Sequence, residues 1–353
     1  MKNKNITIDI VSKEANVSKT TISRYLNGKF EHMSEETRER IKSVIDELEY
    51  RPNVIAQNLK SKKTGLIGVI VSDITNPFVS ILIKGIIDVC TKEGYQVITA
   101  SSNEIMEKEV EYIKSMIDRQ VEGLIVNTTG NNEDFLRSLK DKGIKVVLAD
   151  RPMNQCVLDT VTTDNYEMTI KSIRSLYNCG FDKVALFSNQ IFESNVRVAR
   201  YNAFIKASKD YVDKPNSLIY ILDNNTEEEY KKSLLDFINR YPNEKVAIFT
   251  VNGVTTLNLL KASKNLNLKA PEDFGLCGYD DWDWAKLIGN GISAVSQPSY
   301  DVGVESAKIL IGRIKNHILQ KKPMYVELKS KLILRGSTNM KFVYKGRNVN
   351  AQK

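Results

Sequence analysis

Short apolar runs alternate with amphipathic stretches along most of the chain, from residue 66 onward. Residues 66–72 (LIGVIVS) form an uninterrupted apolar run of strand length, and residues 104–119 repeat apolar side chains at helical spacing. Further apolar runs stand at 95–100, 123–126, 145–149, 184–187, 217–220, 246–249 and 274–277. Runs of this kind, separated by helices, are typical of parallel strands that are buried on both faces. We therefore predict an α/β region of two doubly wound lobes, each with about six strands.

The first 50 residues show a different pattern, in which apolar side chains recur only at helical spacing. Residues 8–15, 19–27 and 34–48 each carry an apolar stripe, which predicts a small all-α bundle of three helices. Asn16 lies between the first two helices and tolerates the left-handed backbone that a tight turn needs. Ser18 suits the start of the second helix, because its hydroxyl can accept a bond from a free backbone N–H. This arrangement is typical of a helix-turn-helix that reads DNA, and a plain helical hairpin is the alternative interpretation.

The second helix leaves a row of polar side chains outside the bundle, and each of them can hydrogen-bond a phosphate or a base edge. They are Lys19, Thr20, Ser23, Arg24 and Asn27. We expect Lys19, Thr20 and Arg24 to contact base edges, and Arg24 is the best match to O6 and N7 of guanine. Ser18, Thr21 and Asn27 are expected to hold phosphates or the fold.

The formal net charge of +8 is confined to the two ends of the chain. Residues 1–63 carry 13 Lys and Arg against 9 Asp and Glu, residues 64–340 carry 34 of each sign, and residues 341–353 carry four basic residues and no acid. The first excess coincides with the predicted helix-turn-helix, where a polyanion would bind. We interpret the second as a solvated tail.

Cysteine and histidine usage disfavours several other kinds of site. The four cysteines are scattered without a CxxC pair, as expected of thiols in a reducing compartment. With only two histidines a His-based metal site is not expected, and no pattern calls for a cofactor. The sequence has neither an apolar signal segment at its start nor an apolar run that could span a bilayer. We therefore expect a cytoplasmic protein without a membrane partner.

Polar residues that follow the predicted strands are candidates for ligand binding, because open parallel sheets bind ligands beyond the carboxyl ends of their strands. They are Asp73, Asn76, Phe78 in the same segment, Asp150, Arg151, Asp164, Asn252 and Asp280, and Arg200 lies in the helical run 195–209. Any one of them could instead serve a helix start, where Asp, Asn and Pro are common.

Residues 1–60 resemble the LacI/GalR family of bacterial transcription regulators. The family pattern of an alanine, a turn residue, Val-Ser and then a helix ending Ser-Arg-x-Leu-Asn-Gly is matched by residues 15–18 and 23–28, and residues 50–59 (YRPNVIAQNL) match its hinge. Four positions depart from the pattern: Asn16 stands where glycine is usual, Ile10 and Ser12 stand for Asp and Ala, and Tyr25 for valine. These changes leave the expected fold intact and bear on the operator sequence.

The resemblance implies that residues 53–63 form a hinge helix and linker, helical only on operator DNA. In the family, a leucine that matches Leu59 enters the minor groove and kinks it, and we expect Ala56 and Lys60 to contact DNA beside it. A segment this short is not helical alone, so it suits an order–disorder switch. We expect a homodimer on pseudo-palindromic double-stranded operator DNA, in which closure of a ligand cleft moves the two hinges together or apart.

Residues 64 to about 338 resemble the family's sugar-sensing domain, which is similar to periplasmic sugar-binding proteins of type I. Its motifs stand in order at 76–78 (NPF), 150–151 (DR), 164–165 (DN), Arg200, Asn252, 278–280 (GYD), 297–298 (QP) and 332–337 (LILRGS). The resemblance implies that Asp150, Arg200, Asn252 and Asp280 line the cleft and that Phe78 offers an apolar face. We also include Gln297 among the expected effector contacts. Carboxylates, amides and a guanidinium suit sugar hydroxyls, which both donate and accept hydrogen bonds.

The sequence departs from the family pattern at two places near the expected cleft. Gly253 replaces the acid that usually follows Asn252, and residues 281–284 (DWDW) add two indoles. We include Trp284 among the effector contacts, although either tryptophan could equally be a core or dimer contact. The expected organisation is a DNA-binding domain (1–52), a hinge (53–63), a two-lobed effector-binding and dimerisation domain (64–340) and a basic tail (341–353). Lobe 1 is expected over about 64–161 and 293–321, and lobe 2 over about 162–292 and 322–340.

The sequence thus predicts a DNA-binding transcriptional regulator, a repressor, that is controlled by a sugar or sugar acid bound between the lobes. Residues 281–284 and 123–129 (GLIVNTT) resemble the branch that controls use of 2-keto-3-deoxygluconate. An enzyme is not expected, because no nucleotide fingerprint, nucleophile elbow or His-based acid–base pair is present. A sugar-binding carrier would need a secretion signal and would not need residues 1–60. A nucleobase sensor of the same family remains the alternative, and inducer and corepressor are both compatible with the scaffold.

Overall fold

Two compact units make up the chain, of which one ends at Thr64 and the other begins at Gly65. The computed structural model describes residues 6–50, 64–130, 132–191, 194–222, 225–316 and 322–339. The expected hinge with Ala56, Leu59 and Lys60, and the basic tail, lie outside the described residues.

The first unit is the predicted bundle of three helices, α1 (Ile8–Glu14), α2 (Lys19–Leu26) and α3 (Glu35–Glu47). Val11, Ala15, Ile22 and Ile41 are fully buried between the helices. The hydroxyls of Ser18 and Ser34 cap α2 and α3, each accepting a hydrogen bond from the backbone N–H three residues later. The apolar stripes and the N-cap serines that the sequence shows therefore account for the three helices and their packing.

The second unit contains two six-stranded sheets, which confirms the two doubly wound lobes. The first sheet has the order β11-β5-β4-β3-β1-β2, with β1 (Leu66–Val71), β2 (Gln96–Ser101), β3 (Gly123–Val126), β4 (Val146–Ala149), β5 (Asp159–Thr163) and β11 (Tyr325–Leu328). The second has the order β12-β10-β9-β8-β6-β7, with β6 (Lys183–Ser188), β7 (Ile219–Ile221), β8 (Val246–Thr250), β9 (Gly275–Tyr279), β10 (Ser293–Ser296) and β12 (Lys331–Ile333). The two strand orders correspond position by position, so the lobes repeat one topology, and among the described strands only β12 runs antiparallel to its neighbour.

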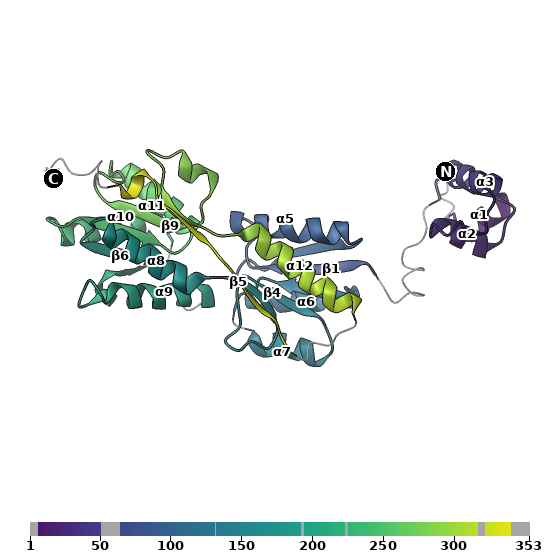
Figure 1. The fold of residues 1–353 in the computed structure, drawn as a ribbon, viewed down its shortest axis with the longest axis horizontal. Coiled ribbons are helices and arrows are strands. Elements are labelled where there is room, and N and C mark those ends of the chain that lie inside the picture. Colours follow the sequence, from purple (N-terminus) through teal and green to yellow (C-terminus); the bar gives the residue numbers. More distant parts are fainter. Residues whose placement is uncertain are drawn as a thin grey trace. The chain divides into compact units, whose positions relative to one another are not determined.

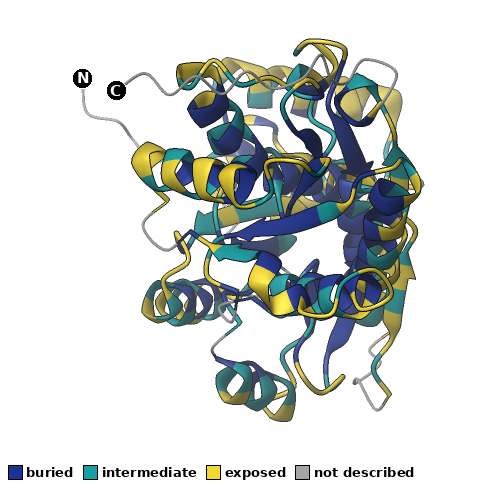
Figure 2. Cartoon of the chain, turned by 90° about the vertical axis from the view of Figure 1, so that its left-hand side faces the viewer, coloured by how far each residue is buried: buried dark blue, intermediate teal, exposed yellow. Residues whose placement is uncertain are grey.

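Four α-helices among the described residues cover each sheet on both faces (Figure 1). They are α5 (Pro77–Lys92), α6 (Met106–Asp118), α7 (Glu133–Asp141) and α12 (Ser299–Lys315) in the first lobe, and α8 (Asn165–Asn178), α9 (Asn195–Ser208), α10 (Glu227–Arg240) and α11 (Gly253–Asn265) in the second. Figure 2 shows the buried strands inside and exposed positions on the outer faces of the helices. None of the described helices has the length and apolar character needed to span a bilayer.

In the part of the chain that the structure describes, three segments pass between the lobes: those between β5 and α8, between β10 and α12, and between β11 and β12. The first crossing follows Thr163, close to the expected boundary at about 161, whereas the other two lie further along the chain than the expected boundaries near residues 292 and 321. Residues 293–296 pair with β9 and belong to the second lobe, and residues 325–328 pair with β5 and belong to the first. The sequence pattern missed this because the choice of an edge partner depends on tertiary pairing, which a local run of apolar residues does not encode.

Helices α5 and α12 lie side by side on one face of the first sheet and approach very closely (Figure 1). A Cβ atom added to Gly303 would lie 2.1 Å from the backbone oxygen of Leu82, and one added to Gly85 would lie 2.2 Å from that of Tyr300. Both obstacles are backbone atoms, so only glycine permits this packing.

We expect Gly303→Ala to lower the free energy of unfolding of the second unit by about 1–3 kcal/mol, because the added methyl group forces the two helices apart. Gly312 lies on the same helix with open space around its Cα, so Gly312→Ala is the matched control. That control should gain about 0.5–1 kcal/mol through helix propensity. Thermal denaturation of both variants checks this, and equal midpoints would contradict the close approach.

Candidate functional site

The turn between α1 and α2 has the geometry that the sequence predicted. Asn16 has a φ of +50°, in the left-handed region, and the N–H of Val17 donates to the carbonyl oxygen of Ser12 at 3.0 Å. Ala15 is fully buried beneath the turn. Asn16 therefore supplies the conformation for which glycine is otherwise used, and the angle between the two helices is fixed.

The polar face of α2 is open to solvent. Lys19, Thr20, Arg24 and Asn27 are exposed, and Thr21 is half-buried. The Ser18 hydroxyl accepts from the N–H of Thr21 at 3.1 Å and contacts its hydroxyl at 2.9 Å, so this pair holds the start of the helix. Lys19 forms an ion pair with Asp9 of α1. Arg24 and Thr20 have no such tie among the described residues, which leaves them available to a base edge.

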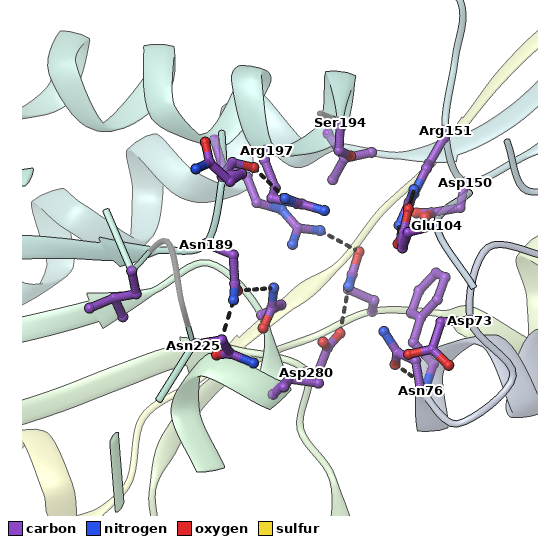
Figure 3. A pocket seen from close by; sticks show the side chains of 18 residues that line it. Asp73, Asn76, Glu104, Asp150, Arg151, Asn189, Ser194, Arg197, Asn225 and Asp280 are labelled. Carbon is purple, nitrogen blue, oxygen red and sulfur yellow. Dashed lines mark hydrogen bonds and ion pairs between the residues drawn. The ribbon is translucent and has the colours of Figure 1, made fainter. Parts of the chain in front are cut away.

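The second unit encloses a pocket of about 370 Å³ between its two lobes (Figure 3). Its described lining consists of residues that follow the carboxyl ends of strands in both sheets and residues at the start of α9. Nine of the eleven expected effector contacts line it: Asp73, Asn76, Phe78, Asp150, Arg151, Arg200, Asn252, Asp280 and Gln297. The shared topology explains this, because parallel strands bring all their carboxyl ends to one edge of each sheet.

Nine further lining residues were not predicted from the sequence: Glu104, Asn189, Gln190, Ser194, Val196, Arg197, Leu222, Asn225 and Val254. Asn189 directly follows β6, so the strand-end rule used for Asp150 could have found it. Arg197 lies three residues before Arg200, a spacing that keeps the two on the same side of α9, and Ser194 is the N-cap residue of that helix. Leu222 and Asn225 follow the three-residue strand β7, which is too short for a clear apolar signal.

Arg200 is the most heavily hydrogen-bonded of these side chains. Only 4% of it is exposed, and its guanidinium lies 3.5 Å from the ring centroid of Tyr279. Nε and Nη2 donate to Oδ1 of Asn165 at 2.9 and 2.6 Å, Nη1 donates to the carbonyl oxygen of Val251, and Nη2 also donates to Oε1 of Gln297 at 3.1 Å. All these acceptors are neutral, so the buried positive charge has no directly paired carboxylate among the described residues.

Asp150 and Asp280 occupy equivalent positions in the two lobes. Each directly follows a strand, each has a φ of +71°, and each donates its backbone N–H to the neighbouring strand. Asp280 accepts from the N–H of Gly253 at 2.9 Å and from Nε2 of Gln297 at 2.6 Å. The left-handed backbone turns both carboxylates out of their sheets and into the pocket.

The charged side chains that the first lobe contributes to the pocket include Glu104, Arg151 and Asp150. Arg151 donates to both carboxylate oxygens of Glu104, at 2.6 and 2.8 Å, so these two charges compensate each other. Asp150 accepts from the side-chain amide of Asn127 at 3.3 Å. Burial raises the pKa of the Asp150 carboxyl above its usual value, although the nearby Arg151 and Arg200 oppose the shift.

Gln297 lines the pocket and connects the two lobes through hydrogen bonds. Its Oε1 accepts from the hydroxyl of Thr163, at the end of β5, at 2.9 Å. Its Nε2 donates to Asp280, and Arg200 donates to its Oε1. A ligand that shifts Arg200 or Asp280 therefore acts on a crossing between the lobes.

Two expected effector contacts do not line the pocket. Asp164 accepts from the backbone N–H of Ser330 at 2.9 Å and so holds the crossing between β11 and β12, while its neighbour Asn165 supports Arg200. Trp284 packs against the core of the second lobe and meets Trp282 edge to face at 5.9 Å. The indole of Trp282 occupies the space that a side chain at Gly253 would need, within 2.7 Å of its added Cβ. The absence of a side chain at Gly253 therefore makes room for the indole of Trp282, so the two departures from the family pattern fit together sterically.

The arrangement suits a small polar ligand. Of 18 described lining residues, 14 are polar or charged, and they offer both donors and acceptors at close range. No cluster of His, Cys, Asp and Glu suited to a metal ion occurs in the described part of the chain. Directional hydrogen bonds would therefore dominate recognition.

Comparison with known proteins yields matches over both units. Residues 7–53 match the model for bacterial regulatory proteins of the lacI family, and residues 67–318 match that for a periplasmic binding protein domain. The chain is 38% identical over 333 residues to the HTH-type transcriptional regulator KdgR of Bacillus subtilis (strain 168), which covers 94% of this chain and 97% of that protein.

Two solved structures have similar folds. The Lac repressor dimer bound to operator and the anti-inducer ONPF has a TM-score of 0.81 at 21% identity, over 95% of this chain and 99% of that one. A LacI family transcriptional regulator from Enterococcus faecium with bound ribose has a TM-score of 0.66 at 23% identity, over 77% of this chain and 98% of that one.

We expect Asn165→Leu to lower the free energy of unfolding by about 1.5–3 kcal/mol, because it removes the acceptor of two hydrogen bonds from the buried guanidinium of Arg200. Asn178→Leu, at the exposed far end of the same helix, is the matched control and should change stability by about 0.5 kcal/mol or less. Thermal and urea denaturation check both variants. Equal effects would mean that Asn165 does not support Arg200.

Proposed function

The chain belongs to the lacI family of bacterial regulatory proteins, and on that premise we propose that it is a repressor controlled by a sugar or sugar acid bound between its lobes. It is a DNA-binding transcriptional regulator and not an enzyme, as its family membership shows. The protein would act in the cytoplasm, where its operator DNA is found.

The observation that carries the effector class is the composition of the pocket. Asp73, Asp150, Asp280 and Asn252 supply acceptors and donors in the density that a polyhydroxylated ligand requires. Phe78 is 5% exposed and provides an apolar wall for the C–H face of a sugar. The bound ribose of the Enterococcus faecium structure is consistent with this class.

A nucleobase effector is less well supported. A flat heterocycle is usually bound between aromatic or apolar faces, and Phe78 is the one aromatic residue in the described lining. The polar majority of the lining instead offers single hydrogen bonds from many directions, which suits hydroxyl groups on a puckered ring.

On DNA, we propose that α2 enters the major groove, where Lys19, Thr20 and Arg24 contact base edges and Ser18, Thr21 and Asn27 hold the helix or phosphates. A helix-turn-helix dimer reads two half-sites about one helical turn apart, so we propose a homodimer on a pseudo-palindromic operator. Sedimentation should give twice the chain mass of 40.0 kDa, and a monomer or stable tetramer would contradict this assembly.

We expect Arg24→Ala to abolish specific operator binding. A bidentate Arg–guanine contact carries about 1–3 kcal/mol of discrimination, and a dimer loses it in both half-sites. Arg24→Lys is the informative control, since it keeps the charge but cannot form the bidentate pair. Gel shifts on operator and random DNA at one salt concentration separate the two effects. Operator affinity like that of wild type in Arg24→Ala would show that α2 is not the reading helix.

We expect Asp280→Ala to bind operator normally and to lose its response to the effector. Removing one charged hydrogen-bond partner costs about 1.5–3 kcal/mol, roughly a 10–100-fold loss of effector affinity. Asp283 is a fully exposed acid three residues further along, so Asp283→Ala should behave as wild type. Calorimetry with sugars and sugar acids measures both variants, and unchanged binding by Asp280→Ala would mean that the pocket has been assigned wrongly.

A further inference from the structure

Both tryptophans of the chain lie in the short segment 281–284, which directly follows the pocket residue Asp280. Trp284 packs against the hydrophobic core of the second lobe, and Trp282 meets it edge to face. Neither indole is among the described residues that line the pocket. Trp282 instead lies beside Gly253, the first residue of α11. Any effect of Trp282 on a ligand therefore passes through the residues that it contacts.

The contact between Trp282 and Gly253 fixes the start of α11. Two atoms of the indole, Cη2 and Cζ2, would both lie 2.7 Å from a Cβ atom added to Gly253. Packed atoms do not approach this closely, so the ring fills the space in which a side chain of residue 253 would lie. Glycine loses more conformational freedom on folding than any other residue. The ring therefore restricts a backbone position that has no side chain of its own to pack.

The backbone N–H of Gly253 is the group that this contact holds in place. It donates to Oδ2 of Asp280 at 2.9 Å in a buried hydrogen bond, and Nε2 of Gln297 donates to the other carboxylate oxygen at 2.6 Å. The first N–H groups of a helix lack intrahelical partners and favour a nearby negative charge. The first turn of α11 contains no acidic residue, so Asp280 provides that charge. The pocket carboxylate is thus oriented by a donor that Trp282 supports.

The segment that carries Trp282 is itself anchored on both sides. Before it, the Asp281 carboxylate forms a bidentate ion pair with Arg335, with N–O distances of 2.6 and 2.8 Å. The Asp281 side chain is 7% exposed, and Arg335 also donates to the carbonyl oxygen of Ile292 at 2.7 Å. After it, the N–H of the buried Ala285 donates to the carbonyl oxygen of Trp282 at 2.8 Å. This anchoring makes the indole a rigid support.

We propose that Trp282 is a positioning residue for effector recognition: its indole holds the Gly253 N–H against Asp280 and so fixes the carboxylate in the orientation that faces the pocket. The inference rests on the proposed effector pocket and adds a residue, outside the lining, on which recognition depends. It also gives the two departures from the family pattern a shared role. With an acid at position 253 the helix would carry its own negative charge, and the indole would have no space.

Amide exchange on the ligand-free, full-length protein tests the first step. With selective isotope labelling of glycine the chain gives 18 residues to follow, and Gly253→Ala identifies the signal of residue 253 by its loss. Trp282→Ala should speed exchange of the Gly253 N–H by about tenfold or more relative to Gly275, because opening becomes easier locally. Gly275 is buried in β9 of the same lobe and is the internal reference. Trp282→Phe should recover most of the protection, since its ring fills part of the same space.

Calorimetry tests the second step, with ribose, gluconate and 2-keto-3-deoxygluconate as probes. Trp282→Ala should weaken binding of the probe that wild type binds most tightly by about tenfold, as expected when a charged hydrogen-bond acceptor loses its orientation. Trp284→Phe is the matched control, since it alters the neighbouring indole and should leave this affinity unchanged. In a double variant of Trp282→Ala with Asp280→Ala the two losses should not add, because both changes act on one contact.

Thermal denaturation tests the steric pair. Gly253→Ala should lower the midpoint of the wild-type protein, because the added methyl group meets the indole of Trp282. The same change should keep or raise the midpoint of Trp282→Ala, in which the space is free and alanine favours the helix over glycine. An equal decrease in both backgrounds would show that the indole does not occupy this space, and the inference would fail.

Two further results would overturn the inference while the proposed regulator stands. Exchange of the Gly253 N–H that keeps pace with that of Gly275 in Trp282→Ala means that the indole does not hold this donor. Wild-type affinity in Trp282→Ala, or a loss that adds to that of Asp280→Ala, means that the tryptophan does not act through the carboxylate. A wild-type protein that binds none of the three probes overturns the proposed effector class, and with it the recognition role of Trp282, whatever the exchange experiment shows.

Discussion

The direction of the strands is the constraint on which the whole second unit depends. A parallel strand must be followed by a crossover before the next one, so every carboxyl end of a sheet emerges at the same edge. With two such sheets in the order seen here, Asp73 and Asp150 come from one edge, and Asn252 and Asp280 from the other, onto one pocket. The polar lining thus follows from topology, while the apolar strands supply the stability on which it rests.

This constraint explains which parts of the site could be predicted from the sequence. Asp150 and Asp280 directly follow strands that are buried along their whole length, so their placement could be read directly. Asp164 and Asn165 stand side by side at a helix start, and nothing in their local pattern distinguishes the residue that holds β12 from the one that holds Arg200. Ser194 follows no strand, and its place in the pocket lining depends on where α9 begins relative to the second sheet, which is a tertiary property.

The fold itself was more predictable than the boundaries of its lobes. The apolar runs of β1 and β8 and the stripes of α2 and α3 are local properties of the sequence, and hydrophobic burial acts on them directly. The sixth strand of each sheet is different. Tyr325–Leu328 and Lys331–Ile333 are short and half-exposed, and they join different sheets although only two residues separate them. Their assignment depends on which sheet edge remains unpaired, which is decided after the rest of the unit has formed.

The same crossings make the pocket a suitable control point for DNA binding. Gln297 and Thr163 lie at two of the three crossings and share one hydrogen bond, and Gln297 also contacts Arg200 and Asp280. A ligand that binds these two charged residues changes the partners of Gln297, and a protein interior transmits such changes because it is closely packed. A ligand can shift the equilibrium between lobe arrangements only by its difference in affinity for them. Contacts that span the lobes, such as the hydrogen bond from Asn195 to Pro152, are where such a difference would arise, because a change in lobe arrangement would alter them.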